Sequence, residues 1–226
     1  MPYMKATMGT IEQKSDGHES TPATRKRSAR TSSVTRLIPV PNESGLAGGE
    51  ETARASVRAA RRSFVTVLFT DIVGSTQRAV DLGDHQWLDL QAAYQAMATE
   101  AVGRFRGRVQ RTMGDGMLAT FSSAIAAAMC AARISEASAS FGLQVRAGLH
   151  AGECERRGRS LGGLVFNIGA RIADLADGNE VLVSQTVKDL VIGSDLEFET
   201  HGWQELDGLP GGWEVYELTS REGRAR

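Results

Sequence analysis

Two aspartates, far apart in the sequence, have the surroundings of a divalent-cation site. Asp71 directly follows residues 64–70, an apolar and β-branched run that is typical of a buried strand. Asp115 lies in a Gly-Asp-Gly turn between two short strand-like segments. Carboxylates that are brought together repel each other, and a divalent cation relieves that repulsion. Two carboxylates, completed by water and phosphate oxygens, are a usual ligand set for Mg²⁺.

The elements around these aspartates predict that the two side chains meet. The strand at 64–70 is followed by a long amphipathic helix at 84–105 and a second strand at 109–112. Such a strand–helix–strand unit places its two strands parallel in one sheet, with a right-handed crossover. If the two strands are neighbours, Asp71 and Asp115 lie at the same edge. Taken singly, each aspartate has an ordinary explanation as a strand-end cap or a turn residue.

A helix is predicted to begin beside the first aspartate. Gly74, Ser75 and Thr76 are typical of a helix N-terminus, where backbone N–H groups lack partners within the helix. Those N–H groups and the helix dipole favour a phosphate. We therefore expect a phosphate site over Val73, Gly74, Ser75 and Thr76, next to the cation site.

A second pair of polar residues shares one face of a predicted helix. Asn167 and Arg171 are four residues apart, and the apolar Phe166, Ile168 and Ile172 mark the buried side. Asparagine can hold a ribose by hydrogen bonds, and arginine can neutralise charge that develops on a phosphoryl group. The structural alternative is a capping asparagine and a surface arginine. His150, at the end of a predicted strand, is interpreted as a core residue.

The whole pattern predicts an α+β fold: a ferredoxin-like βαββαβ sandwich with a C-terminal αβ extension. Residues 113–116 read as a hairpin turn, and residues 152–163, rich in glycine and arginine, as a loop or short arm. Strands are predicted at 64–70, 109–112, 117–121, 144–150, 181–183, 196–206 and 213–218. Helices are predicted at 84–105, 166–174 and 184–191, and one more runs from the capping residues Ser122 and Ser123 to about residue 140.

Charge and composition set residues 1–60 apart. Residues 1–62 hold eleven Lys and Arg against six Asp and Glu, a net +5, which leaves −6 for the rest of a chain whose total is −1. This segment has no Phe or Trp and holds four of the five prolines, so it cannot bury enough apolar surface to order itself. We predict a disordered tail over 1–60, with a helix as one option for 50–62, a domain over 61–220 and a short tail over 221–226.

The net charge, the lengths of the apolar runs and the cysteine spacing argue against several classes of protein. A net charge of −1 argues against a whole-chain role on nucleic acid, and the basic residues at 25–27 and 30 are interpreted as part of a solvated tail. No apolar run is long enough for a membrane span or a secretory signal, so a cytoplasmic protein is expected. Cys130 and Cys154 lack the spacing of zinc ligands and are interpreted as buried or free thiols.

Three separated motifs resemble one known family. They are FTDIVGST at 69–76, GDGMLATF at 114–121 and NIGAR at 167–171. In this order they are similar to the catalytic domain of class III nucleotidyl (adenylate/guanylate) cyclases, in an actinobacterial, mycobacterial-like form. The resemblance covers about residues 63–219. It implies the ferredoxin-like fold of that class, with the C-terminal αβ extension.

The resemblance also implies a role for each motif residue. Asp71 and Asp115, with the carbonyl of Ile72, would hold two divalent cations, Mg²⁺ or Mn²⁺. Asn167 would position the ribose, and Arg171 would stabilise the α-phosphate in the transition state. The substrate would be ATP or GTP, cyclised by attack of its 3′-OH on the α-phosphorus. The active sites would lie at the interface of a homodimer, with the metal carboxylates from one subunit and Asn167 and Arg171 from the other.

Three positions depart from the family's pattern. The residues that read the purine correspond to Arg111 and Ser160, where the family's adenine-selecting pair is lysine and aspartate. Arg111 offers only donors, which suit the guanine O6 or the adenine N1. Asp207 stands where a triphosphate-binding lysine is usual. The alternatives are therefore an adenylate cyclase, a guanylate cyclase, and a degenerate cyclase-like module that binds nucleotide or dimerises with little activity.

Overall fold

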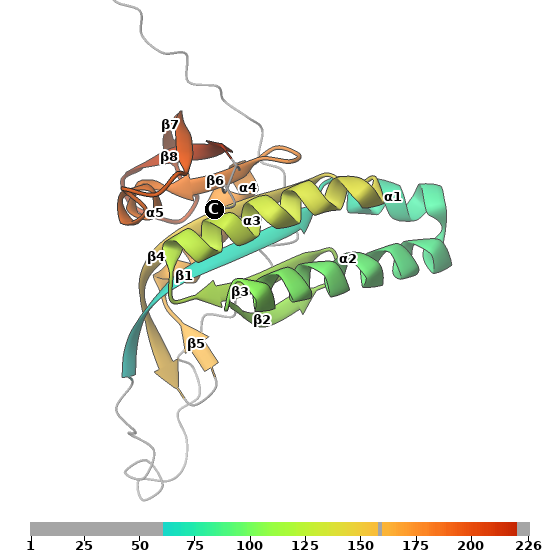
Figure 1. The fold of residues 1–226 in the computed structure, drawn as a ribbon, viewed down its shortest axis with the longest axis horizontal. Coiled ribbons are helices and arrows are strands. Elements are labelled where there is room, and N and C mark those ends of the chain that lie inside the picture. Colours follow the sequence, from blue (N-terminus) through green and yellow to red (C-terminus); the bar gives the residue numbers. More distant parts are fainter. Residues whose placement is uncertain (1–60, 158–159, 221–226) are drawn as a thin grey trace, which may run out of the picture. The chain divides into compact units, whose positions relative to one another are not determined.

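The computed structural model describes residues 61–157 and 160–220. The elements in chain order are β1 (Arg61–Ile72), α1 (Ser75–Leu82), α2 (Asp84–Arg104), β2 (Arg108–Met113), β3 (Gly116–Phe121), α3 (Ala124–Ser138), the 3-10 helix η3 (Ala139–Phe141), β4 (Val145–Arg157), β5 (Ser160–Gly162), α4 (Leu164–Leu175), β6 (Val181–Ser184), α5 (Gln185–Leu190), β7 (Glu197–Glu205) and β8 (Gly212–Ser220). Figure 1 shows them coloured along the chain.

The strands form one sheet in the order β2-β3-β1-β4-β6-β8-β7, and β5 pairs with β4 outside this path. β1 is antiparallel to both of its neighbours, β3 and β4, while β4 and β6 are parallel. The first four strands with their helices form the predicted βαββαβ unit, and β6, α5, β7 and β8 form the C-terminal extension. The α+β prediction is therefore confirmed.

The condition that the first two strands are neighbours is not met. β2 is not next to β1, because β3 lies between them and pairs with both. The hairpin return that follows the Gly-Asp-Gly turn takes the place beside β1, and β2 forms the edge of the sheet. β1 and β2 still run in the same direction, since each is antiparallel to β3. The Asp115 turn thus reaches β1 through β3.

Two further boundaries differ from the sequence prediction. β4 continues to Arg157, well beyond the predicted end at 150, and pairs with β5 as a hairpin arm. Within the glycine- and arginine-rich segment, residues 152–157 and 160–162 are therefore strand. Arg61 and Arg62 belong to β1, so the optional helix at 50–62 is wrong at these two residues. The predicted tails at 1–60 and 221–226, with the basic residues at 25–27 and 30, lie outside the described residues.

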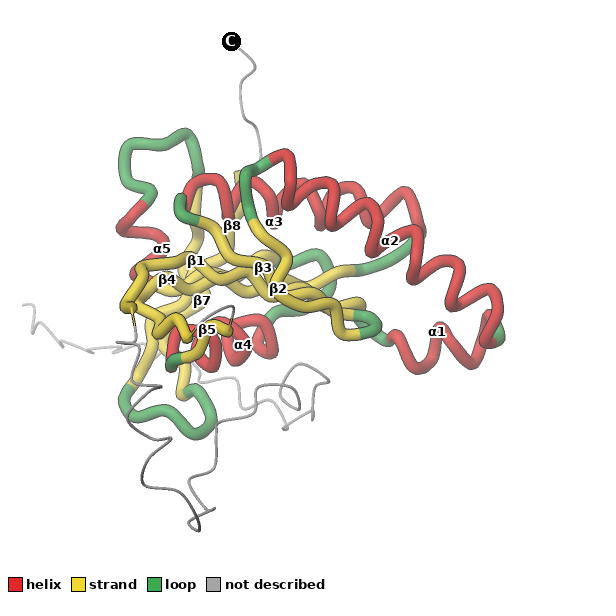
Figure 2. Tube along the Cα trace, turned by 90° about the horizontal axis from the view of Figure 1, so that it is seen from below, coloured by secondary structure: helices red, strands yellow, loops and turns green. Residues whose placement is uncertain are grey.

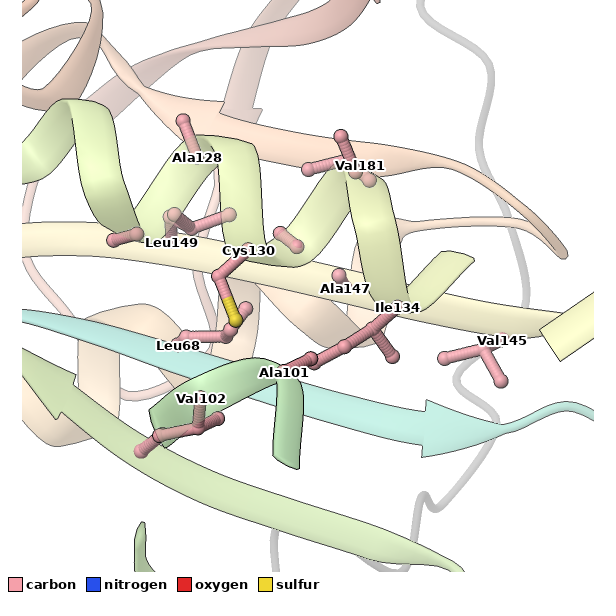
Figure 3. Close-up of a cluster of buried hydrophobic side chains, with 14 of the residues drawn as sticks. Leu68, Ala101, Val102, Ala128, Cys130, Ile134, Val145, Ala147, Leu149 and Val181 are labelled. Atoms are coloured by element: carbon pink, nitrogen blue, oxygen red, sulfur yellow. The ribbon is translucent and has the colours of Figure 1, made fainter. Parts of the chain in front are cut away.

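Helices cover both faces of the sheet. Figure 2 shows α2 and α3 on one side and α4 on the other. The main core lies between the sheet and α2 and α3, and Figure 3 shows part of it, with Leu68 from β1, Val102 from α2, Cys130 from α3 and Leu149 from β4. Burial raises the pKa of the Cys130 thiol to about 12, in keeping with the predicted buried thiol. Cys154 is also a buried free cysteine.

The second layer depends on glycines that let α4 approach the strands closely. A Cβ built on Gly148 of β4 would lie 2.2 Å from the backbone nitrogen of Ala173 in α4. A Cβ on Gly169 of α4 would lie 2.6 Å from Cγ2 of Val67 in β1. Small residues at both positions therefore fix how α4, with Asn167 and Arg171, lies on β1 and β4.

Within the described residues, no helix is both long and apolar enough to cross a membrane.

Candidate active site at the end of the first strand

Asp71 lies where three strands meet. It is the penultimate residue of β1, and it is paired across the sheet with Gly116 of β3 on one side and Arg146 of β4 on the other. The residue is 2% exposed. On the helix side of β1, the buried Tyr94 of α2 donates a hydrogen bond to Oγ1 of Thr70 at 3.0 Å. The chain therefore holds the Asp71 carboxylate in a fixed and nearly dry place.

The turn between β2 and β3 brings Asp115 to the same place. Gly114 takes a φ of +67°, a conformation that glycine adopts without strain. Gln95 of α2 donates from Nε2 to the Gly114 carbonyl at 2.5 Å, which ties the turn to the helix. The backbone N–H of Ile72 donates to the Asp115 carbonyl at 3.1 Å, and the Ser75 hydroxyl donates to Oδ2 of Asp115 at 2.5 Å.

The two predicted carboxylates are therefore brought together, and their charges interact. Burial is the main cause that raises the pKa of Asp71 above its usual value, and the negative charge of Asp115 raises it further. Arg146 acts in the opposite direction, because its guanidinium favours the ionised carboxylate. The fold thus places two carboxylates at the end of β1, where burial disfavours the charge of Asp71 and a nearby cation such as Arg146 favours it.

Arg146 is a site residue that the sequence prediction missed. Its Nε and Nη2 both donate to Oδ2 of Asp71, at 3.1 and 2.5 Å. The Arg146 side chain is 16% exposed, so this ion pair is shielded from water. The signal in the sequence was a basic residue inside the predicted strand at 144–150. Its partner could be found only from the β1–β4 register.

The donor set fits a hard divalent cation that completes its shell with substrate and water oxygens. Asp71 and Asp115 offer carboxylate oxygens, and such ligands suit Mg²⁺ or Mn²⁺. Within residues 61–157 and 160–220, no group of three or more His, Cys, Asp or Glu side chains is placed to hold a metal ion.

The predicted phosphate site is narrower than the sequence suggested. α1 begins at Ser75, after Gly74 with a φ of +70°, so the predicted helix start is confirmed. The Val73 N–H, however, donates to the carbonyl of Gln144 at 2.8 Å and is engaged by the protein itself. Gly74, Ser75 and Thr76 remain at the open end of the helix, where the first N–H groups have no acceptor within the helix.

Asn167 and Arg171 lie on α4 as predicted. The apolar stripe of that helix is buried, with Phe166 3%, Ile168 7% and Ile172 0% exposed, while Asn167 and Arg171 are half-buried. The face that carries the two polar residues thus remains partly open, whereas the other faces of α4 pack against the sheet.

Arg171 contacts two acidic residues. Its Nη2 lies 3.2 Å from Oδ2 of Asp207 and its Nη1 lies 3.7 Å from Oδ2 of Asp174. Nε donates to the Asp207 backbone carbonyl at 3.1 Å. The negative charge of Asp174 also contributes to the raised pKa of Asp71. Asp174 therefore links the acidic residues around Arg171 to the two aspartates at the end of β1.

Of the remaining candidates, two are exposed and one is buried. Arg111 and Ser160 are both exposed, and they lie on β2 and β5, strands that do not pair with each other. His150 is 6% exposed, its Nδ1 lies 2.8 Å from the Ser184 hydroxyl, and its ring packs edge-on against Trp213. Burial lowers the pKa of His150 to about 4. The prediction that His150 is a core residue is confirmed.

Sequence comparisons give partial matches. No family model matches the chain. The Rhizobium meliloti (strain 1021) protein named "Putative adenylate cyclase 3" is 29% identical over 158 residues, which cover 66% of this chain and 27% of that protein. An uncharacterized protein of Mycobacterium tuberculosis (strain ATCC 25618 / H37Rv) is 34% identical over 161 residues, covering 65% of this chain and 52% of that protein. This chain thus spans about a quarter to about half of these relatives.

Solved structures match over almost their whole length. The adenylyl cyclase CyaB from P. aeruginosa superposes with a TM-score of 0.69 at 18% identity, covering 74% of this chain and 99% of that chain. The guanylate cyclase domain of RhGC from Catenaria anguillulae, solved in complex with GTP, gives a TM-score of 0.65 at 18% identity, covering 72% of this chain and 100% of that chain. This chain thus has the fold of the class III adenylate/guanylate cyclase catalytic domains, which confirms the resemblance carried by its three sequence motifs.

Proposed function

We propose that this protein is a purine nucleotide cyclase that converts ATP to 3′,5′-cyclic AMP and pyrophosphate. The observation that carries the proposal is the convergence of Asp71 and Asp115 at the end of β1, where Asp71 pairs with Gly116 and the Ile72 N–H donates to the Asp115 carbonyl. It occurs on a fold shared with adenylyl and guanylyl cyclases.

The reaction joins the ribose 3′-oxygen to the α-phosphorus. The bond from that phosphorus to the bridging oxygen of the β-phosphate breaks, and pyrophosphate leaves with the electron pair. The 3′-OH loses its proton to solvent, so the products are the cyclic nucleotide, pyrophosphate and a proton. Asp71, Asp115 and the Ile72 carbonyl would hold two Mg²⁺ or Mn²⁺ ions. Such ions, when bound, lower the pKa of the hydroxyl and neutralise charge on the phosphates. No protein nucleophile is required, as in other phosphoryl transfers that depend on positioning and electrostatics.

The protein's own groups would then orient the substrate. Asn167 would hydrogen-bond the ribose, and Arg171 would pair with the charge that grows on the α-phosphate. The open end of α1 at Gly74, Ser75 and Thr76 would receive phosphate oxygens through backbone N–H groups. Arg146 would keep the Asp71 carboxylate ionised and in place for the cations.

We further propose that each active site is shared by two copies of the chain. One copy would supply Asp71 and Asp115, and the other would supply Asn167 and Arg171. A homodimer would thus contain two sites, and an isolated monomer would be inactive. This arrangement comes from the resemblance of the three motifs.

GTP is the second candidate substrate. Arg111 carries only donors, and these suit O6 of guanine as well as N1 of adenine. Ser160 can donate or accept, but its hydroxyl cannot match a carboxylate in holding the exocyclic amine of adenine. Arg111 and Ser160 are therefore the residues that would decide between the two purines.

The test is the chemical identity of the product. The full chain is incubated with Mn²⁺ and either ATP or GTP, and products are identified by mass. Cyclic AMP from ATP is the expected result, and cyclic GMP alone would transfer the proposal to the second substrate. The absence of any cyclic product, from a protein that is folded and dimeric, would refute the enzyme assignment. Arg111→Lys is the matched variant, and it is expected to raise the ratio of ATP to GTP turnover.

A further inference from the structure

Arg171 is already engaged by the protein itself. One side of its guanidinium faces the turn between β7 and β8, where Nε donates to the Asp207 carbonyl and Nη2 lies 3.2 Å from the Asp207 carboxylate. The other terminal nitrogen, Nη1, lies 3.7 Å from Asp174. All three nitrogens of the guanidinium therefore face oxygen atoms of acidic residues in this chain.

The two acidic partners differ in how easily they could move away. The side chain of Asp174 is 18% exposed and lies on α4 itself, whereas that of Asp207 is 89% exposed and lies in a turn. An exposed ion pair contributes little to stability, because water solvates both groups when they separate. The Asp207 contact is therefore one that a competing anion could break at low cost.

A phosphate would compete for the same donors. Arginine binds carboxylates and phosphates in the same planar, two-pronged manner, so one edge of the guanidinium cannot serve both at once. A phosphate that approached while Asp207 remained in place would also meet its negative charge. Both effects oppose binding of a triphosphate at Arg171.

We propose that Asp207 is an autoinhibitory residue, whose carboxylate occupies the Arg171 guanidinium until a nucleoside triphosphate displaces it. The inference rests on the proposed function, because that function assigns Arg171 to the α-phosphate. The side chain of Asp207 restrains the site without taking part in the reaction. Removing it releases Nη2 of Arg171 for the substrate, while Nε keeps the backbone carbonyl of residue 207 and Nη1 keeps Asp174.

The variant that tests this is Asp207→Ala, with Glu205→Ala as its matched control. Glu205 is also an exposed acid, two residues away at the end of β7, so its removal changes the net charge by the same amount. The KM for ATP with Mn²⁺ is expected to fall roughly two- to fivefold in Asp207→Ala, the range that an exposed ion pair commonly supplies. Glu205→Ala is expected to leave KM unchanged.

A binding measurement separates the proposed inhibition by Asp207 from any effect of Asp207 on catalysis. Inorganic tripolyphosphate with Mn²⁺ is titrated into the wild-type chain, into Asp207→Ala, and into both proteins carrying Arg171→Gln. Asp207→Ala should bind the probe more tightly, and this gain should vanish in the Arg171→Gln background. A gain that persisted there would show that Asp207 acts through its general charge, and would overturn the inference.

Failure of the inference and failure of the proposed function have different signatures. If the wild type forms a cyclic product while Asp207→Ala has an unchanged KM, the function stands and the restraint is refuted. A lower kcat at unchanged KM would refute it as well, since Asp207 would then align Arg171 for the reaction. If neither protein binds ATP, GTP or tripolyphosphate, the proposed function and the restraint both fall.

Discussion

Asp71 of β1 is paired across the sheet with Gly116 of β3, the residue that directly follows Asp115. A Cβ at Gly116 would lie 2.9 Å from the Thr70 carbonyl and 3.4 Å from Oδ1 of Asp71, so only glycine fits there without a shift of the backbone. This pairing places the Asp115 turn against the end of β1. It is the geometric reason why two carboxylates 44 positions apart in the sequence act on one another.

The shared active site predicts complementation between two inactive variants. Asp71→Ala removes a metal carboxylate, and Arg171→Ala removes the cation for the α-phosphate. When the two proteins are mixed and allowed to exchange subunits, each heterodimer contains one site with all native residues. Activity should return to a fraction of the wild-type rate, measured as cyclic nucleotide formed with Mn²⁺.

The control for this mixture is each variant incubated alone at the total protein concentration of the mixture. Neither alone should form product. If subunit exchange is verified and no activity returns, the metal carboxylates and Arg171 do not meet across a dimer interface, and the shared site is wrong.

The sequence predicted that Asp71 and Asp115 come together, but it did not predict the strands and side chains around them. Asp71 and Asp115 could be found because one ends a strand and the other lies in a tight turn. Each alone has an ordinary structural role, but two carboxylates that the strand topology brings together are not explained by those roles. The order of β3 and β1 could not be found from local pattern, because strand adjacency depends on contacts distant in sequence. The same limit hid the pairing of Arg146 with Asp71.

Asp207 shows another limit of sequence reasoning. The sequence showed that Asp207 stands where the resemblance implies a lysine. It could not show where the Asp207 side chain points, because that depends on how the β7–β8 turn faces α4. That contact with Arg171 appears only in three dimensions. The length of β4 was missed for a related reason, since glycine and arginine disfavour a strand prediction although pairing with β1 and β5 stabilises it.

A stability prediction concerns the close packing of α4. Gly148→Ala would place a methyl group 2.2 Å from the backbone of Ala173, and backbone cannot move aside without displacing the helix. We expect a loss of at least about 1–3 kcal/mol in the free energy of unfolding, measured by denaturant titration. The control is Gly162→Ala in β5, where a Cβ meets no atom within 4 Å and the loss should be small. Equal stability of Gly148→Ala and wild type would contradict the packing described for α4.

A pH prediction concerns His150. Its pKa is lowered by burial to about 4, whereas in the unfolded chain it is about 6.5. Between these values the unfolded state binds more protons than the folded state, so the free energy of unfolding rises with pH in this window and falls as the pH drops. The loss from pH 7 to pH 4 should be about 3 kcal/mol from this residue.

The contribution of His150 is isolated with His150→Gln, whose amide can replace the contact with the Ser184 hydroxyl and does not titrate. Denaturant titrations at several pH values between 4 and 7 should give this variant a flatter pH dependence than wild type. If both proteins lose stability in parallel over that range, His150 is not the group responsible.

The most direct test of the account is metal-dependent turnover in Asp115→Ala. The carboxylate of Asp115 lies in the turn beside Asp71, and its loss removes a ligand from the proposed cation site. With Mn²⁺ and ATP or GTP, cyclic product should fall at least about a hundredfold, since the ions supply several kcal/mol of transition-state stabilisation. The exposed acid Asp195 provides the control, and Asp195→Ala should keep the wild-type rate. Asp115→Ala that is folded and turns over at the wild-type rate would contradict the central claim that Asp71 and Asp115 together hold the catalytic ions.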